Sequence, residues 1–158
     1  MPEHLDLIEA SDGMRLYSLL THSRVAAARP TSDLWVIRLA EIDAPEKKQP
    51  FGERSRQALA SLCFQREAVL RPTTTDRYGR TVARVECDCR DANAEQVRAG
   101  MAWAYTQYQA DPAIPHLELQ ARRTRTGLWS DLGTAAEPMA PWEWRKARRE
   151  IGSRPRPS

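Results

Sequence analysis

The feature that most constrains the fold of this 158-residue chain is the spacing of its apolar residues. The spacing is mostly two residues in the first half and three or four residues in the second half. In the first part of the chain, apolar and polar residues alternate, which is typical of strands with one buried face. This alternation predicts strands at residues 5–9, 14–22, 34–39, 69–72 and 81–89. Apolar residues at helical spacing predict helices at 52–63, 93–99 and 115–126, the second of which stops at Gly100 as a helix C-cap.

Three strands, an inserted helix, two further strands and then C-terminal helices follow the order of an OB-fold barrel. We therefore predict an α+β protein with a mainly β core, namely a five-stranded OB-fold barrel with inserted and C-terminal helices. The barrel domain should span residues 5–132. Residues 133–158 should form a Trp- and Arg-rich extension that ends in a disordered Pro/Arg tail.

The composition excludes two broad classes of protein. Hydrophobic residues make up 41% and charged residues 28% of the chain, and the mean hydropathy is −0.64. These values fit neither a disordered chain nor a membrane protein. No apolar run approaches the roughly 20 residues of a spanning helix, and the sequence as given shows no export signal, so the compartment stays open.

The three cysteines, Cys63, Cys87 and Cys89, are too few for a disulfide scaffold or a four-ligand zinc site. Free cysteine usually behaves as a small buried residue, and that interpretation is favoured here. A bridge from Cys63 to either of the other two stays open.

The positive charge is concentrated in the C-terminal part of the chain. The net charge is +3, yet residues 122–158 hold nine Lys or Arg against four Asp or Glu. Such a tail can track a phosphate backbone by neutralising its charge. The favoured interpretation is a solvated basic helix with a frayed, Pro-rich end.

Aromatic residues in the second half are interpreted as packing residues. Trp142 and Trp144 should hold the C-terminal segment against the barrel. Trp103 and Tyr105 should lie either in a helix core, which is the favoured interpretation, or in a wall near the cleft.

Three polar clusters occur where predicted strands end. They are Arg38–Glu46, Asp76–Arg80 and Ser11–Gly13. The first offers an arginine and carboxylates, whose oxygens suit Ca²⁺, and the second is a turn that can direct Arg80 toward the first. Each cluster alone is typical of a solvated turn, so the functional interpretation depends on their occurring together.

Five motifs occur in one order along the chain. They are VIRLAEIDAPE (36–46), QPFGERS (49–55), TDRYGRTVARV (75–85), DANAEQVRAGMAWAY (91–105) and ARRTRTGLW (121–129). With these motifs, residues 7–130 resemble the staphylococcal nuclease family, the thermonuclease-like OB-fold nucleases. The segment PWEWR, residues 141–145, resembles a C-terminal feature of some bacterial members.

The resemblance implies a Ca²⁺-dependent nuclease that hydrolyses phosphodiester bonds in DNA and RNA. By position, Arg38 and Arg80 would be catalytic arginines that bind phosphate, and Glu46 would position or activate the attacking water. Two planar guanidinium groups can neutralise charge on the phosphoryl oxygens while water attacks in line. Tyr78 and Arg77 would bind the nucleic acid beside the scissile bond.

The resemblance also implies that calcium is held by Asp43 and by the main-chain carbonyl of Ala44. The first strand departs from the family, whose Asp-Gly-Asp-Thr turn supplies a second direct ligand. The best alignment places Met14 at that position, and a thioether cannot replace a carboxylate for a hard cation. A shift of two residues would place Asp12 there, so Asp12 stays a candidate ligand, and Glu41 or extra water would otherwise complete the shell.

Three functions remain for this sequence. The leading one is the calcium-dependent nuclease, with DNA or RNA as substrate and neither a membrane nor an obligate protein partner implied. The second is a catalytically impaired nucleic-acid-binding module of nuclease ancestry, because Met14 replaces the expected aspartate. The third is a protein-interaction domain on the same barrel. Asp43 and Glu46 together favour the enzyme, since a pure binder has no need of carboxylates beside a phosphate.

Overall fold

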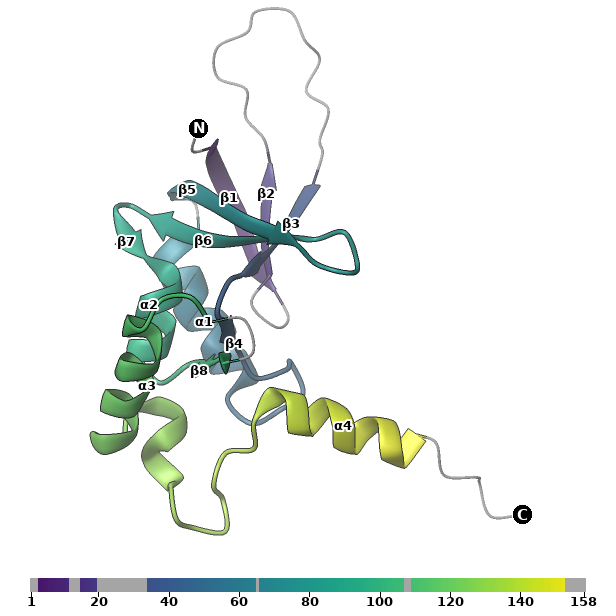
Figure 1. The fold of residues 1–158 in the computed structure, drawn as a ribbon, viewed down its shortest axis with the longest axis vertical. Helices are drawn as coiled ribbons and strands as arrows, with labels where there is room; N and C mark the ends of the chain where they lie inside the picture. Colours follow the sequence, from purple (N-terminus) through teal and green to yellow (C-terminus); the bar gives the residue numbers. More distant parts are fainter. Residues whose placement is uncertain (1–2, 12–14, 20–33, 65, 107–108, 153–158) are drawn as a thin grey trace, which may run out of the picture.

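The structure is a computed structural model that describes residues 3–11, 15–19, 34–64, 66–106 and 109–152. Six strands form one sheet in the order β3-β2-β1-β5-β6-β7 (Figure 1). Their bounds are β1 Glu3–Ser11, β2 Arg15–Leu19, β3 Leu34–Leu39, β5 Glu67–Thr75, β6 Thr81–Cys87 and β7 Arg90–Asp91. Neighbours in this order are antiparallel, so the sheet consists of two meanders joined where β1 pairs with β5.

The strand β3 has a further partner. Its residues Ile37, Arg38 and Leu39 pair in parallel with Thr81, Val82 and Ala83 of β6. This pairing joins the two outer members of the run β3-β2-β1-β5-β6, which is the contact that a five-stranded barrel requires. The helices and strands of the structure confirm the mixed α and β class. The closed five-stranded OB-fold barrel stays a prediction.

The helices gather mainly on one side of the sheet (Figure 1). In the described ranges they are α1 Gly52–Cys63, α2 Ala92–Arg98, α3 Ala113–Arg123, a 3₁₀ helix Gly127–Asp131 and α4 Pro141–Gly152. Two short strands, β4 Ile42–Asp43 and β8 Trp103–Ala104, pair with each other below the sheet. None of the described helices combines the length and apolar character needed to cross a bilayer.

The main core lies between the sheet and α1, α2 and α3. Alternation places Ile37 and Leu39 of β3 on one buried face, while Arg38 between them is only half-buried. Leu59 of α1 and Val97 of α2 pack in the same cluster. The side chain on the opposite face of β3 is therefore the one left available for chemistry.

The helix at residues 52–63 and the strand at 34–39 are confirmed with their predicted bounds. The helix predicted at 93–99 is confirmed as α2, and Gly100 follows it with a φ of 64°, as a C-terminal cap requires. A Cβ at Gly100 would lie 2.1 Å from the carbonyl oxygen of Thr126, so this glycine also permits close contact between two chain segments.

The helical assignment of Trp103 and Tyr105 is wrong. Trp103 lies in β8, where it is 3% exposed in a second cluster with Trp129, and Tyr105 directly follows that strand. Backbone pairing with β4 imposes the extended conformation, and no local pattern in the sequence reveals that distant partner. The predicted turn around residues 12–13 and the connection at 26–33 lie outside the described residues.

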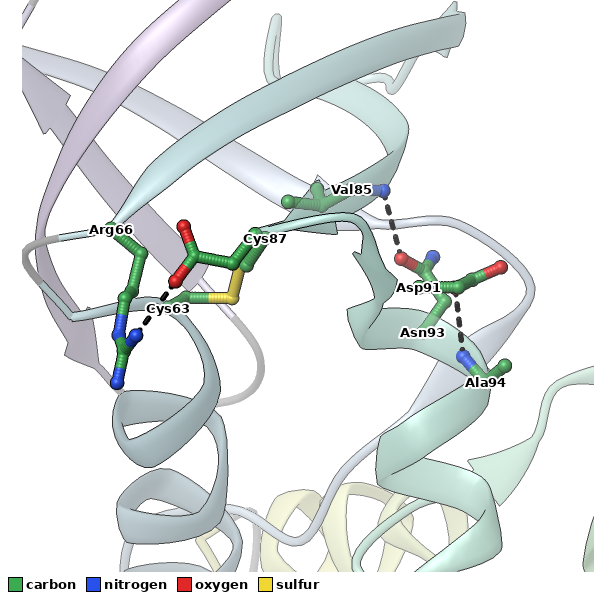
Figure 2. The surroundings of a disulfide bond; sticks show 8 residues. Cys63, Arg66, Val85, Cys87, Asp91, Asn93 and Ala94 are labelled. Carbon is green, nitrogen blue, oxygen red and sulfur yellow. Dashed lines mark hydrogen bonds and ion pairs between the residues drawn. A yellow bond between two sulfur atoms is a disulfide. The ribbon is translucent and has the colours of Figure 1, made fainter.

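A disulfide links the end of α1 to the end of β6 (Figure 2). It joins Cys63 to Cys87, both buried, whereas Cys89 is a free and exposed thiol. The ion pair between Arg66 and Asp88 lies beside the bridge. The favoured interpretation of free cysteines is therefore wrong for Cys63 and Cys87, and the alternative of a bridge from Cys63 is confirmed with Cys87 as its partner.

Reducing the Cys63–Cys87 bridge should lower the free energy of unfolding by about 3 kcal/mol, because the bridge restricts the unfolded chain. The bridged residues are 24 positions apart. Urea unfolding of the oxidised and reduced protein measures the difference. Cys89→Ser should leave the oxidised protein within about 0.5 kcal/mol of the wild type, and identical unfolding midpoints with and without reductant would contradict the bridge.

Candidate active site

The candidate site begins where the chain leaves β3 and enters β4. Asp43 pairs in the backbone with Trp103, and the amide of Tyr105 donates a hydrogen bond to the carbonyl of Glu41 at 2.8 Å. These contacts fix the backbone on both sides of Asp43. Asp43 is 5% exposed and Ala44, the next residue, is buried.

A buried asparagine holds the end of β3 against β6 and α2. Asn93 is fully buried, its Nδ2 donates to the carbonyl of Ala40 at 2.8 Å, and its Oδ1 accepts from the amide of Val85 at 2.9 Å (Figure 2). Asp91, two residues earlier, caps α2 by accepting from the amide of Ala94. One side chain therefore ties three elements together directly under the candidate site.

The loop that carries Glu46 is held by two residues of the motif at 49–55. The amide of Glu46 donates to Oε1 of Gln49 at 3.1 Å, and Nε2 of Gln49 donates to the carbonyl of Met139 at 2.5 Å. A Cβ on Gly52 would lie 2.1 Å from the carbonyl oxygen of Glu46. The start of α1 thus touches the Glu46 backbone, and only glycine fits at that contact.

Both acidic side chains of this site contact one arginine. Nη2 of Arg145 lies 2.6 Å from Oδ2 of Asp43, and Nη1 lies 2.8 Å from Oε1 of Glu46. Arg145 belongs to α4, about a hundred positions later in the chain. The basic segment as a whole is predicted to be a solvated helix, and the local signal that singles out Arg145 is its position at the end of the PWEWR segment, residues 141–145.

Burial raises the pKa of the Asp43 carboxyl above its ordinary value, because the charged form loses hydration. The hydrogen bond and the charge of Arg145, together with the charge of Arg38, offset part of this effect, and the charge of Glu46 adds to it. The ionised carboxylate therefore depends on nearby cations.

Arg38 lies on β3 at the wall of a cleft of about 720 Å³. Its guanidinium carbon lies 5.7 Å from the centroid of the Tyr105 ring, which lines the same cleft. The remaining lining comes from the end of β3 and the residues after it, from the hairpin between β5 and β6, and from the segment before α3, namely Leu39–Ile42, Thr73–Tyr78 with Val82, and Ala110. Tyr105 is thus a wall residue of the cleft and not a core residue.

The opposite rim is the turn Asp76–Arg80, whose shape depends on one carboxylate. Oδ1 of Asp76 accepts from the amides of Tyr78 at 2.9 Å and Arg80 at 3.0 Å, and Gly79 adopts a φ of 77°. Tyr78 is 69% exposed, and the guanidinium groups of Arg77 and Arg80 lie 4.9 Å and 5.3 Å from its ring centroid. The turn presents an exposed aromatic ring between two cations.

The structure brings Arg38, Asp43 and Glu46 together, and it holds Arg80 elsewhere. Nε of Arg80 donates to Oδ2 of Asp76 at 2.6 Å. The charged groups that act on Asp43 are Arg145, Arg38 and Glu46. Arg80 therefore lies on the rim of the cleft with Tyr78, facing its own turn.

The other candidate ligands for a cation differ from the expectation. Glu41 is 9% exposed, and both of its oxygens are engaged by the amides of Ala110 and Asp111 and by Arg84. Its carboxylate supports the segment that follows β8 and is not directed to the acidic pair. Asp12 and Met14 lie outside the described residues.

The donors present suit a hard divalent cation in type, although their number is small. Asp43, Glu46 and the carbonyl of Ala44 offer oxygen, which is what Ca²⁺ takes. The acidic pair already holds a cation, the guanidinium of Arg145. Among the residues that the structure describes, no group of three or more His, Cys, Asp or Glu side chains is arranged to hold a metal ion.

The fold and the site define an α+β protein with an arginine-lined cleft beside an acidic pair, in which Asp43 is buried and Glu46 half-buried. The family model of staphylococcal nuclease homologues matches residues 36–131, and the chain belongs to this family.

Several proteins are similar to this chain in sequence, and three of them are described here. "Protein ParB" of Escherichia coli is 46% identical over 121 residues, which is 70% of this chain and 66% of the relative. An uncharacterized endonuclease of Escherichia coli O157:H7 is 44% identical over 110 residues, 69% of each chain. A micrococcal nuclease of Shigella flexneri is 43% identical over 122 residues, 70% of this chain and 68% of the relative. The chain thus spans about two thirds of the length of these relatives.

Gly52→Ala should lower the free energy of unfolding by about 1–3 kcal/mol, because the added methyl group overlaps the backbone of Glu46. Thermal unfolding measures the loss. Gly152→Ala at the end of α4 is the matched control, since a Cβ there meets nothing within 4 Å. An equal effect of the two substitutions would contradict the proposed close contact.

Asp43→Asn should stabilise the protein near neutral pH, because the raised pKa of Asp43 means that its ionised form is less favourable in the folded than in the unfolded protein. A carboxyl with a raised folded-state pKa destabilises the fold above that pKa, and the effect disappears below the unfolded-state value of about 3.9. The gain in urea unfolding should therefore be present at neutral pH and absent well below that value. Asp88→Asn, at an exposed ion pair, serves as control and should change stability little. A loss of stability in Asp43→Asn at neutral pH would contradict the prediction.

Proposed function

We propose that this protein is a nuclease that hydrolyses phosphodiester bonds in DNA and RNA with the help of Ca²⁺. The observation that carries the proposal is that Arg38, on the wall of an arginine-lined cleft, is close enough to Asp43 for its charge to act on that carboxyl, while Asp43 and Glu46 form an acidic pair around one guanidinium. The family membership and the printed names of relatives, an endonuclease and a micrococcal nuclease, support it.

The cleft suits a nucleic-acid strand. Arg38 on one wall and Arg77 and Arg80 on the rim supply guanidinium groups for phosphate oxygens. The exposed ring of Tyr78 offers a face on which a base can stack, an interaction that all bases share. This combination supports binding of the backbone without selection of sequence.

The chemistry assigned to the chain is attack of water on phosphorus. Glu46 is the half-buried and more exposed member of the acidic pair. Its carboxylate can hold the water and accept its proton as the new P–O bond forms. Arg38 and Arg80 would neutralise the charge that develops on the phosphoryl oxygens as the bond to the leaving oxygen breaks. For this role Arg80 must leave Asp76 and turn across the cleft.

Asp43 and the carbonyl of Ala44 would hold the calcium ion, with Asp12 as a further proposed ligand. When bound, the ion would supply positive charge to the phosphate oxygen next to Arg38. Asp43 suits this role because its burial makes the carboxylate dependent on a cation.

The alternative proposal is a nucleic-acid-binding module with impaired catalysis. Arg145 favours it, because this guanidinium already neutralises Asp43 and Glu46. In that case the arginines and Tyr78 would bind the strand, and no bond would break.

Digestion of single-stranded DNA by the purified protein in Ca²⁺, in Mg²⁺ and in EDTA distinguishes the two proposals. We expect cleavage in Ca²⁺ and none in EDTA. Arg80→Ala should lower the rate by about 100-fold or more, the loss seen when one donor is removed from a preorganised oxyanion site.

Arg71→Ala is the matched control for that assay, since Arg71 is an exposed arginine of β5 paired with Glu86 outside the cleft. It should leave the rate nearly unchanged. Salt-sensitive binding of DNA without cleavage in any metal would reject the nuclease and support the binding module.

A further inference from the structure

We propose that Arg145 acts as a latch on the candidate site. Its guanidinium occupies the cation position between Asp43 and Glu46, so that a divalent cation at this acidic pair and the docked helix α4 exclude one another. The inference rests on the proposed function, which places a cation at these carboxylates. It concerns a segment that lies beyond the family match at residues 36–131.

The latch uses the oxygens that a metal ion would need. Arg145 lies 2.6 Å from Oδ2 and 3.5 Å from Oδ1 of Asp43, and 2.8 Å from Oε1 of Glu46. A calcium ion takes carboxylate oxygens at about 2.3–2.6 Å. An ion on these oxygens would therefore overlap the guanidinium, and two positive charges at such a distance repel each other.

The acidic pair requires a nearby positive charge both when α4 is docked and when it is released. Asp43 has a side chain that is 7% exposed, so an uncompensated carboxylate there would be strongly unfavourable. Arg145 is 34% exposed in its side chain and is thus accessible from solvent. An incoming cation replaces one compensating charge by another, and Asp43 is never left alone.

Apart from Arg145, α4 is attached to the protein mainly through its first turn, where Pro141 is buried and the half-buried Trp144 has a buried indole nitrogen. Pro141 is its one buried residue in the described structure, and beyond Arg145 its residues are mostly exposed. Trp142 is 37% exposed and its ring lies 5.8 Å from that of Tyr105. Figure 1 shows α4 extending away from the sheet and from α1–α3. Loss of the Arg145 contacts would leave α4 held by its first turn alone and free its exposed C-terminal half.

Release of α4 would also change the cleft. Tyr105, which lines the cleft beside Arg38, would lose its aromatic neighbour Trp142. Binding of the cation would therefore change the surroundings of Tyr105, the cleft wall against which a nucleotide would lie. In the free protein, the docked helix keeps the acidic pair neutralised and the site closed to metal.

Calorimetric titration of the full chain with Ca²⁺ tests the latch without measuring cleavage. Arg145→Gln should bind Ca²⁺ at least tenfold more tightly than the wild type, because the competing cation is gone. Arg148→Gln is the matched control, since it removes the same charge from an exposed position of the same helix, and its affinity should stay within about twofold of the wild type, as expected of a solvent-screened charge. Asp43→Asn should abolish the binding in either background.

Hydrogen exchange of residues 141–150 provides the second measurement. In the wild type, saturating Ca²⁺ should raise exchange in this segment, and in Arg145→Gln exchange should already be high without Ca²⁺. Trp142→Ala, which loosens α4 and leaves every charge in place, should tighten Ca²⁺ binding in the same direction. This variant keeps the test decisive if Arg145→Gln folds poorly.

The outcomes separate the latch from the proposed function. If the wild type binds Ca²⁺ through Asp43 and Arg145→Gln binds it no more tightly than Arg148→Gln, the latch is rejected and calcium binding stands. If α4 is as protected in saturating Ca²⁺ as without it, the latch is also rejected. If none of the variants binds Ca²⁺, both the latch and the calcium dependence are rejected.

Discussion

The structure of the candidate site depends on one desolvated charge, the carboxylate of Asp43. Burial raises its pKa, and Arg145 and Arg38 supply the positive charge that keeps the ionised form tolerable. The surrounding backbone leaves the side chain little freedom, because β4 is paired with β8 and the end of β3 is tied to β6 through Asn93. A carboxylate held in this way is poor for stability and well prepared for a cation, since the protein has already met the energetic penalty of orienting and desolvating it.

The two sides of the cleft differ in how they are built. The side with Arg38 and Asp43 grows out of paired strands beside the main core, with α1 touching the Glu46 loop through Gly52. The side with Tyr78 and Arg80 is a single turn, organised by the carboxylate of Asp76 and open to solvent. The first side therefore holds its side chains on a rigid frame, whereas the second is free to adjust if a nucleic-acid strand binds there as proposed.

Sequence reasoning predicted what local patterns determine. The alternation in β3, the helical spacing in α1 and the glycine after α2 gave those elements correctly, and the ordered motifs gave the family. Sequence reasoning failed where the conformation or location of a residue depends on a partner far away in the sequence. Trp103 is extended because β4 pairs with it, and Arg145 belongs to the site because the chain returns after a hundred residues. The orientation of Arg80 toward Asp76 likewise depends on a turn geometry that the motif does not specify. Asp12, outside the described residues, remains a prediction.

The structure gives the basic C-terminal segment a role that its charge alone did not predict. Its charge suggested either a solvated helix or an arm for phosphate, and most of α4 is indeed exposed. Yet one of its arginines neutralises the acidic pair, and this follows from the burial of Asp43 rather than from the charge of the tail. A site that binds a cation strongly must hold a substitute when that cation is absent, because an unpaired buried carboxylate would destabilise the fold. In the proposed latch, the guanidinium on α4 compensates the charge while docked and can leave without unfolding the main core, to which α4 does not belong.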